Sequence, residues 1–256
     1  MKKILLALSA ISLLSSNAMA FDSLSMVSPD TYAKNTFNLD ILYNSDVYQA
    51  DLEDYKRSAW GIKGGVKLPI TTRSYKDYEF YWRWQLKYEN LTSKIRTKIE
   101  YDDQGLPIGG NTELSGDTNV LDLNVYLGHS VNFTKFFVTG EVGIGYDYEF
   151  RSSGDVEEIA SEFDIDTLSM PGASANIGIV FPLTRYWEVG YQFGATAYYE
   201  ESLEHSLLAR YDNDIMFSYR SSNEFHYNYG IKMFKYSNSP AYNGQITIGC
   251  NWAWLD

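Results

Sequence analysis

The sequence predicts an all-β chain that closes into an antiparallel transmembrane β-barrel, with ten strands as the favoured count and eight as the alternative. Three observations predict this fold. Two-faced extended segments recur from near residue 35 to the end, they run for roughly ten to fifteen residues each, and aromatic residues gather at their ends. Tight connections also alternate with longer ones, which is the habit of barrels that cross a membrane.

The clearest two-faced segment covers residues 136–150. Its even positions are apolar or aromatic, such as Val138 and Ile144, whereas its odd positions are small, polar or acidic, such as Glu141 and Asp147. Successive side chains of a strand point to opposite faces, so this segment predicts a strand with one apolar and one polar face. The alternation recurs in residues 37–43, 60–68, 78–89, 121–128, 189–197 and 245–254. No comparable stretch has the spacing of a helix, so we expect little or no helix after residue 20.

The connections fall into two classes. Short connections are expected at residues 69–77, 132–135, 182–185 and 221–223, and long ones at residues 44–56, 91–117 and 151–170. After Tyr199 the sequence allows two divisions into strands and loops. A ten-strand division places the last three strands at residues 206–220, 224–236 and 244–254, whereas a nine-strand division makes residues 200–223 one loop. Single-chain bacterial barrels have even strand numbers, which favours ten.

The apolar face of these strands is expected to meet lipid. A strand that crosses a membrane needs about 9–11 residues, whereas strands of water-soluble proteins have about 5–6. Aromatic side chains suit the membrane interface and form girdles there. We expect an aromatic girdle at one end of the barrel, formed by Tyr78, Phe80, Phe136, Trp187, Trp252 and Trp254. The alternative is a soluble periplasmic β-domain with its apolar face turned inward.

The polar face carries charges of both signs. If this face lines a narrow lumen, acids and bases can pair there. We name the expected set the lumen charge belt: Lys63, Lys67, Glu79, Arg83, Lys87, Asp122, Glu141, Asp147, Glu188 and Lys232. Such pairs would help to close the lumen with side chains.

The N-terminus has the features of an export signal. Lys2 and Lys3 precede an apolar run, and Ala18-Met19-Ala20 fits the small-residue pattern of a cleavage site. We therefore expect a signal peptide at residues 1–20, an N-terminal lead-in at 21–34 and the barrel domain at 35–256. The alternative is that the run stays as an N-terminal anchor. No later window is long and apolar enough for a transmembrane helix.

Charge and cysteine content exclude some function classes. The net charge is −12, and removal of Lys2 and Lys3 with the signal peptide would make it more negative. Nucleic acid is therefore not an expected partner, because phosphate binding needs a basic surface. Cys250 is the only cysteine, so an intramolecular disulfide cannot form.

Taken together, these features resemble the class of small bacterial outer-membrane β-barrel proteins. The resemblance covers about residues 35–256 and rests on pattern, so it indicates a class and no particular family. It implies location in the cell outer membrane, short periplasmic turns and long external loops. It also implies contact with outer-membrane lipid and lipopolysaccharide, and delivery by the barrel assembly machinery. Barrels of this class often end on an aromatic residue, but here Leu255 and Asp256 follow Trp254.

Residues that could carry chemistry are few. An omptin-type protease would need acidic and Asp–His pairs at the outer rim, and neither Asp102-Asp103 nor Glu204-His205 lies in a matching motif. His129 has lipid-facing parity, and His226 has lumen parity. An external loop holds clustered acids that could bind a divalent cation or a surface ligand, but it matches no calcium loop: Asp155, Glu157, Glu158, Glu162, Asp164 and Asp166. We therefore assign no catalytic, cofactor-binding or metal-binding residues.

The sequence favours a structural or surface-interaction barrel whose lumen is filled by side chains. The interior of an eight-strand barrel is filled, while open channels need about sixteen strands. A narrow porin-like channel for small solutes is the alternative. A hydrolase at the outer rim is the more distant one.

Overall fold

The computed structural model describes residues 34–49, 53–70, 78–97, 113–133, 135–154, 169–200, 206–222, 224–237 and 243–254. These residues form ten β-strands: β1 (Asn35–Gln49), β2 (Glu53–Pro69), β3 (Tyr78–Thr97), β4 (Glu113–Asn132), β5 (Phe137–Gly154), β6 (Ser169–Pro182), β7 (Trp187–Glu200), β8 (Ser206–Arg220), β9 (Phe225–Tyr236) and β10 (Asn243–Trp254). Among them, no helix is long and apolar enough to cross a membrane. The predicted signal peptide and the lead-in up to residue 33 lie outside the described residues.

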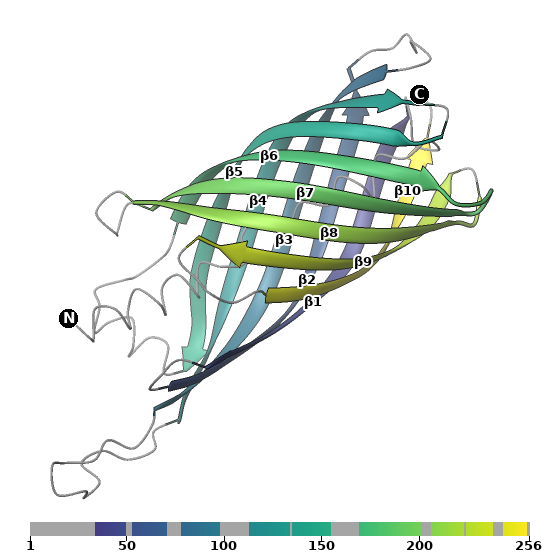
Figure 1. Cartoon of the computed structure of the whole chain (residues 1–256). Coiled ribbons are helices and arrows are strands. Elements are labelled where there is room, and N and C mark those ends of the chain that lie inside the picture. The colour runs from purple at the N-terminus through teal and green to yellow at the C-terminus, as the bar shows by residue number, and fades with distance from the viewer. Residues whose placement is uncertain are drawn as a thin grey trace, which may run out of the picture.

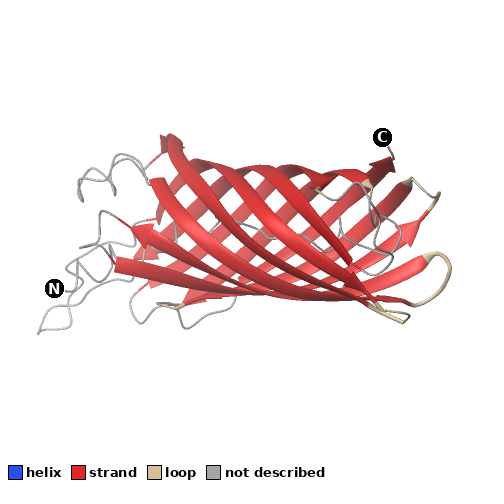
Figure 2. Ribbon diagram, turned by 90° about the horizontal axis from the view of Figure 1, so that it is seen from above, coloured by secondary structure: helices blue, strands red, loops and turns tan. Residues whose placement is uncertain are grey.

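The strands close into one barrel (Figure 1). Each strand pairs antiparallel with its neighbours in the chain, and β1 pairs with β10 from Asn35↔Trp254 to Ser45↔Gly244. The strands are strongly tilted and wrap around the barrel (Figure 2). The prediction of a closed antiparallel barrel with ten strands is therefore confirmed within the described residues. The nine-strand division is wrong because residues 206–220 form β8 rather than a loop.

The barrel is apolar outside and polar inside. On β3, for example, Trp82 and Trp84 are 45% and 49% exposed, whereas the intervening Arg83 is fully buried. The same alternation holds along the other strands, as the sequence pattern predicts. Inverted polarity of this kind is the property of barrels whose outer face meets hydrocarbon.

Two described tight turns, β4–β5 and β6–β7, lie where the sequence predicts them. In the β4–β5 turn, the Phe133 amide donates to the Phe136 carbonyl at 2.9 Å. In the β6–β7 turn, the Leu183 amide donates to the Trp187 carbonyl at 2.8 Å. Both chain ends of the barrel lie at this same end, because Asn35 pairs with Trp254.

The connections at the opposite end are shorter than predicted. β1 continues to Gln49 and β2 begins at Glu53, although a loop is expected over residues 44–56. Likewise β3 continues to Thr97 and β4 begins at Glu113, although a loop is expected over 91–117. These extensions are rich in Asn, Asp, Ser and Lys, so they lack the apolar signal of a membrane strand. Pairing with neighbouring strands satisfies their backbone groups instead.

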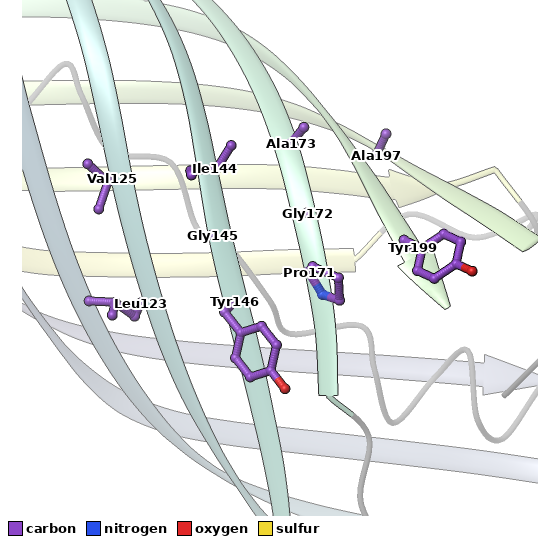
Figure 3. Close-up of a pocket in the computed structure, with 10 residues that line it drawn as sticks. All are labelled: Leu123, Val125, Ile144, Gly145, Tyr146, Pro171, Gly172, Ala173, Ala197 and Tyr199. Carbon is purple, nitrogen blue, oxygen red and sulfur yellow. The ribbon is translucent and has the colours of Figure 1, made fainter. Parts of the chain in front are cut away.

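The outward face is hollowed over β4, β5, β6 and β7. A groove of about 620 Å³ runs there between large side chains such as Leu123 and Tyr146, over small ones such as Ala173 (Figure 3).

Candidate functional site in the charged barrel interior

The predicted site residues divide between the two faces of the barrel. Every member of the lumen charge belt points inward and is buried, with an exposed fraction of 5% or less. The girdle residues lie on the outward side: Tyr78, Phe80, Trp187 and Trp252 are 37–54% exposed, and Phe136 and Trp254 are half-buried. The interior is therefore the part of the described structure where charged groups meet.

An ion pair between Arg83 and Glu141 links β3 to β5 inside the barrel. Arg83 Nε donates to Glu141 Oε1 at 3.0 Å, and its Nη2 donates to Oε2 at 2.8 Å. The remaining Nη1 donates to Gln85 Oε1 at 2.7 Å. The guanidinium also lies 3.8 Å from the centroid of the Tyr126 ring. This paired, two-point geometry is the strongest arrangement for an arginine and a carboxylate, and burial removes competition from water.

Two tyrosines complete this pair, and glycines make room for them. The Tyr81 hydroxyl donates to Glu141 Oε1 at 2.9 Å. Gly128 lies opposite Tyr81 in the β3–β4 register, and a Cβ atom there would overlap the Tyr81 ring. Gly143 has the same relation to Tyr126 between β4 and β5. Glycine within a strand permits this close approach of a ring to the neighbouring backbone.

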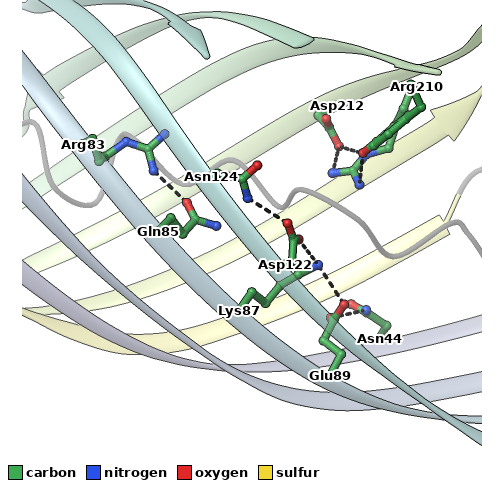
Figure 4. A network of polar contacts seen from close by, with 10 residues as sticks. Asn44, Arg83, Gln85, Lys87, Glu89, Asp122, Asn124, Arg210 and Asp212 are labelled. Carbon is green, nitrogen blue, oxygen red and sulfur yellow. Dashed lines mark hydrogen bonds and ion pairs between the residues drawn. The ribbon is translucent and has the colours of Figure 1, made fainter. Parts of the chain in front are cut away.

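Lys87 joins a second cluster in the interior (Figure 4). Its Nζ lies 2.8 Å from Glu89 Oε2 and 3.0 Å from Asp122 Oδ2. Asn44 on β1 donates to Glu89 Oε1 at 3.0 Å, and Asn124 donates to Asp122 Oδ1 at 2.8 Å. One ammonium group therefore balances two carboxylates, and two amides satisfy the remaining oxygens.

Two further ion pairs involve β2, the strand next to β3. On β2, Lys67 pairs with Glu79 at 3.0 Å. Nearer the middle of the same strand, Lys63 pairs with Asp40 at 3.0 Å. The sequence places these residues on the polar face, and the register shows which of them meet.

Arg210 and Asp212 on β8 are absent from the predicted lumen charge belt, although they belong to the interior. Arg210 Nη2 lies 2.8 Å from Asp212 Oδ1, and both side chains are buried. The signal for them is the alternation of Arg210, Asp212 and Asp214 with Tyr211, Asn213 and Ile215. This alternation mixes polar residues into both faces, so the sequence leaves open whether the segment is strand or loop.

An apolar cluster also lies inside the barrel. Tyr81, Phe137, Val180 and Met216 are fully or almost fully buried and pack together, although they come from β3, β5, β6 and β8. Apolar side chains at inward positions leave no groups that need water, so such a cluster helps to close a lumen. Sequence parity places Phe137 inward but cannot show that it meets Met216.

Asp147 is the least satisfied carboxylate of the lumen charge belt. It lies directly opposite Asp122 in the β4–β5 register, it is 1% exposed, and neither of its oxygens accepts a hydrogen bond from a described residue. We expect Asp147→Asn to raise the free energy of unfolding at pH 8 by about 1–3 kcal/mol, because it removes a poorly compensated buried charge. Urea unfolding in detergent micelles measures this. The matched variant Asp122→Asn should be destabilising instead, because Asp122 binds Lys87; equal effects of the two variants would contradict the assignment.

The histidines do not form a catalytic arrangement within the described structure. His129 is outside the barrel and packs against Phe80, with ring centroids 4.4 Å apart. His226 is buried inside, and its partners in the strand register are Arg220 and Asn251 rather than an acid. His205 and the acidic cluster at residues 155–166 lie outside the described residues. Of the described side chains, no three from His, Cys, Asp and Glu are arranged to hold a metal ion.

No family model matches the sequence, and a search of curated proteins finds no match. Among solved structures, the transport unit of the autotransporter AIDA-I from Escherichia coli is similar, with a TM-score of 0.50 and 7% identity over 98% of this chain and 97% of that one. The translocator domain of autotransporter NalP from Neisseria meningitidis gives 0.48 and 10% over 86% and 88%. The outer membrane protease OmpT from Escherichia coli gives 0.43 and 11% over 86% and 97%. At these identities the likeness concerns fold alone, and this chain has the closed antiparallel fold of bacterial outer-membrane β-barrels.

Proposed function

We propose that this protein is a structural or surface-interaction barrel of the Gram-negative outer membrane and that it does not conduct solutes. The observation that carries the proposal is the buried Arg83–Glu141 pair with the Tyr81 hydroxyl bound to it. Fully buried charges that are paired at this quality are held in place rather than free to move with a solute.

Barrel size and interior packing support the same conclusion. A barrel of ten strands is close to the eight-strand case, in which side chains fill the interior. The clusters around Arg83 and Lys87 are both built on β3, and the pair of Arg210 with Asp212 lies on β8. The apolar cluster of Tyr81, Phe137, Val180 and Met216 links β3 to β8. Charged and apolar groups therefore both narrow the lumen.

The proposed partners follow from the two ends and the outer face. The apolar outer face would contact outer-membrane lipid, and lipopolysaccharide would contact the external end. The acidic segment at residues 155–166 would receive a cationic surface ligand, because its charge repels anions. Insertion would use the barrel assembly machinery.

Single-channel recording in planar lipid bilayers tests the closed lumen. We expect folded, detergent-purified protein to insert without steady unitary conductance steps. A folded barrel is recognised by its altered gel mobility before and after heating, so absence of insertion is separable from absence of conduction.

Reproducible conductance in the unsubstituted protein would instead support a narrow channel. In that case Arg83→Met/Glu141→Met should change the size of the steps, because it replaces the charges that narrow the lumen. Steps of constant size in both proteins would indicate conduction around the barrel rather than through it.

A further inference from the structure

The outward groove over β4 to β7 differs from the rest of the apolar surface. It has a volume of about 620 Å³, and its lining includes Leu123, Ile144, Tyr146, Ala173, Ala197 and Tyr199. We call it the outer groove. Among the described residues that line it, none is charged, and both flanking tyrosines are more than 40% exposed.

The groove arises because β6 and β7 present small side chains where their neighbours present large ones. Pro171, Ala173 and Ala175 follow one another on the outward face of β6, and Ala197 lies beside Ala173 in the register. By contrast, β5 presents Ile144 beside Ala173. The surface is therefore hollowed over the first residues of β6 and the last residues of β7, between the larger side chains of their neighbours.

Two phenol groups lie at one end of the outer groove. Figure 3 shows the rings of Tyr146 and Tyr199 with their hydroxyls at the end that leads toward the loop side of the barrel, while Val125 and Ala173 lie farther along. The groove therefore has an apolar floor and a hydrogen-bonding end. Amphipathic rings of this type mark the boundary between hydrocarbon and headgroup.

We propose that the outer groove binds one acyl chain of an outer-leaflet lipid, with the Tyr146 and Tyr199 hydroxyls donating hydrogen bonds to its ester or headgroup oxygens. This inference rests on the proposed outer-membrane location. A straight saturated acyl chain matches a narrow apolar groove. A chain lying over the small side chains of the floor gains van der Waals contact with them and with the larger side chains on either side. Over β1 and β3 the outward side chains are large and exposed, as at Ile41, Tyr43, Trp82 and Trp84, so those strands lack the small-residue floor of the outer groove.

A second copy of the barrel is a poorer occupant. Ten residues line the groove, whereas a stable protein interface uses about 20–30 residues on each side.

Filling the groove tests the proposal. In Ala173→Phe and Ala197→Phe a ring would occupy the floor. Gly244→Phe on β10 is the matched control, because Gly244 is exposed and a Cβ atom there meets no atom within 4 Å. Native mass spectrometry in detergent, with a dimyristoyl phospholipid and lipid A as separate probes, measures the fraction that retains one lipid. We expect this fraction to fall about tenfold in both floor variants and to stay unchanged in Gly244→Phe.

The other outcomes overturn the inference. Equal lipid retention in all four proteins would show that the groove is no site. A dimer mass that disappears in the floor variants would identify a second copy as the occupant. If the protein conducts in bilayers but the floor variants still lose the bound lipid, the closed lumen is rejected and the lipid site in the outer groove stands. A wild-type chain that stays folded and monomeric without detergent would reject both.

Discussion

Arg83→Met is expected to lower the free energy of unfolding by about 3–5 kcal/mol, because it breaks a buried ion pair from one side only. Methionine fills similar space, but among the described residues it leaves the buried Glu141 carboxylate with the Tyr81 hydroxyl and the more distant Asn176 amide as hydrogen-bond donors. Urea unfolding in detergent micelles, followed by tryptophan fluorescence, measures the loss. The free energy of unfolding of Arg83→Lys should lie between that of the unsubstituted protein and that of Arg83→Met. An ammonium group keeps the charge but cannot make the two-point contact.

A double substitution separates the ion pair from simple packing. In Arg83→Met/Glu141→Met both charges are replaced by apolar groups, so no unpaired charge stays buried. We expect this protein to be more stable than Arg83→Met alone. If the double variant lost as much free energy of unfolding as Arg83→Met and Glu141→Met lose together, the two residues would act independently. The ion pair would then not organise the interior.

Ile41→Arg is expected to lower the free energy of unfolding in lipid vesicles by about 2–4 kcal/mol. Ile41 is 64% exposed, lies between Phe37 and Tyr43 on the outward face of β1, and is flanked in the register by Ile62 and Ile248. A charge at such a position enters the centre of the hydrocarbon layer if the outer face meets lipid. The same substitution on a water-facing surface would change stability by only about 0.5 kcal/mol.

The matched control for Ile41→Arg lies in a turn. Leu183 is 58% exposed between β6 and β7, so it is as accessible as Ile41 but lies at the end of the barrel. Leu183→Arg should cost about 0–1 kcal/mol. If both substitutions cost equally little, the outer face does not meet hydrocarbon, and the proposed location fails with it.

The fold is largely predictable because a membrane barrel uses one simple rule along its whole length. The alternation that places Arg83 between Trp82 and Trp84 is visible in the sequence, and it recurs in nearly every strand. The rule fails where strands leave the apolar layer. Residues 91–97 are largely polar, so only their pairing with β2 and β4 shows that they are strand.

The interior is predictable as a set of residues but not as a set of contacts. Parity assigns Glu141 and Arg83 to one face, yet they are on β5 and β3, and only the register through Gly128 brings them together. The outer groove is not predictable at all. Alanine at 173 and 197 has no special meaning in the sequence until the two strands are placed side by side.

The seam between β1 and β10 joins residues from the two ends of the barrel domain, such as Asn35 and Trp254. Before β10 is in place, β1 is paired only with β2, and the most recently formed strand is paired only with the strand before it. Each of these two strands therefore has one edge of unpaired amide and carbonyl groups. Such edges recruit other chains, and contacts of long sequence separation form slowly. During assembly, two unpaired strand edges must therefore be protected at the same time. Pairing of β10 with β1 removes both edges.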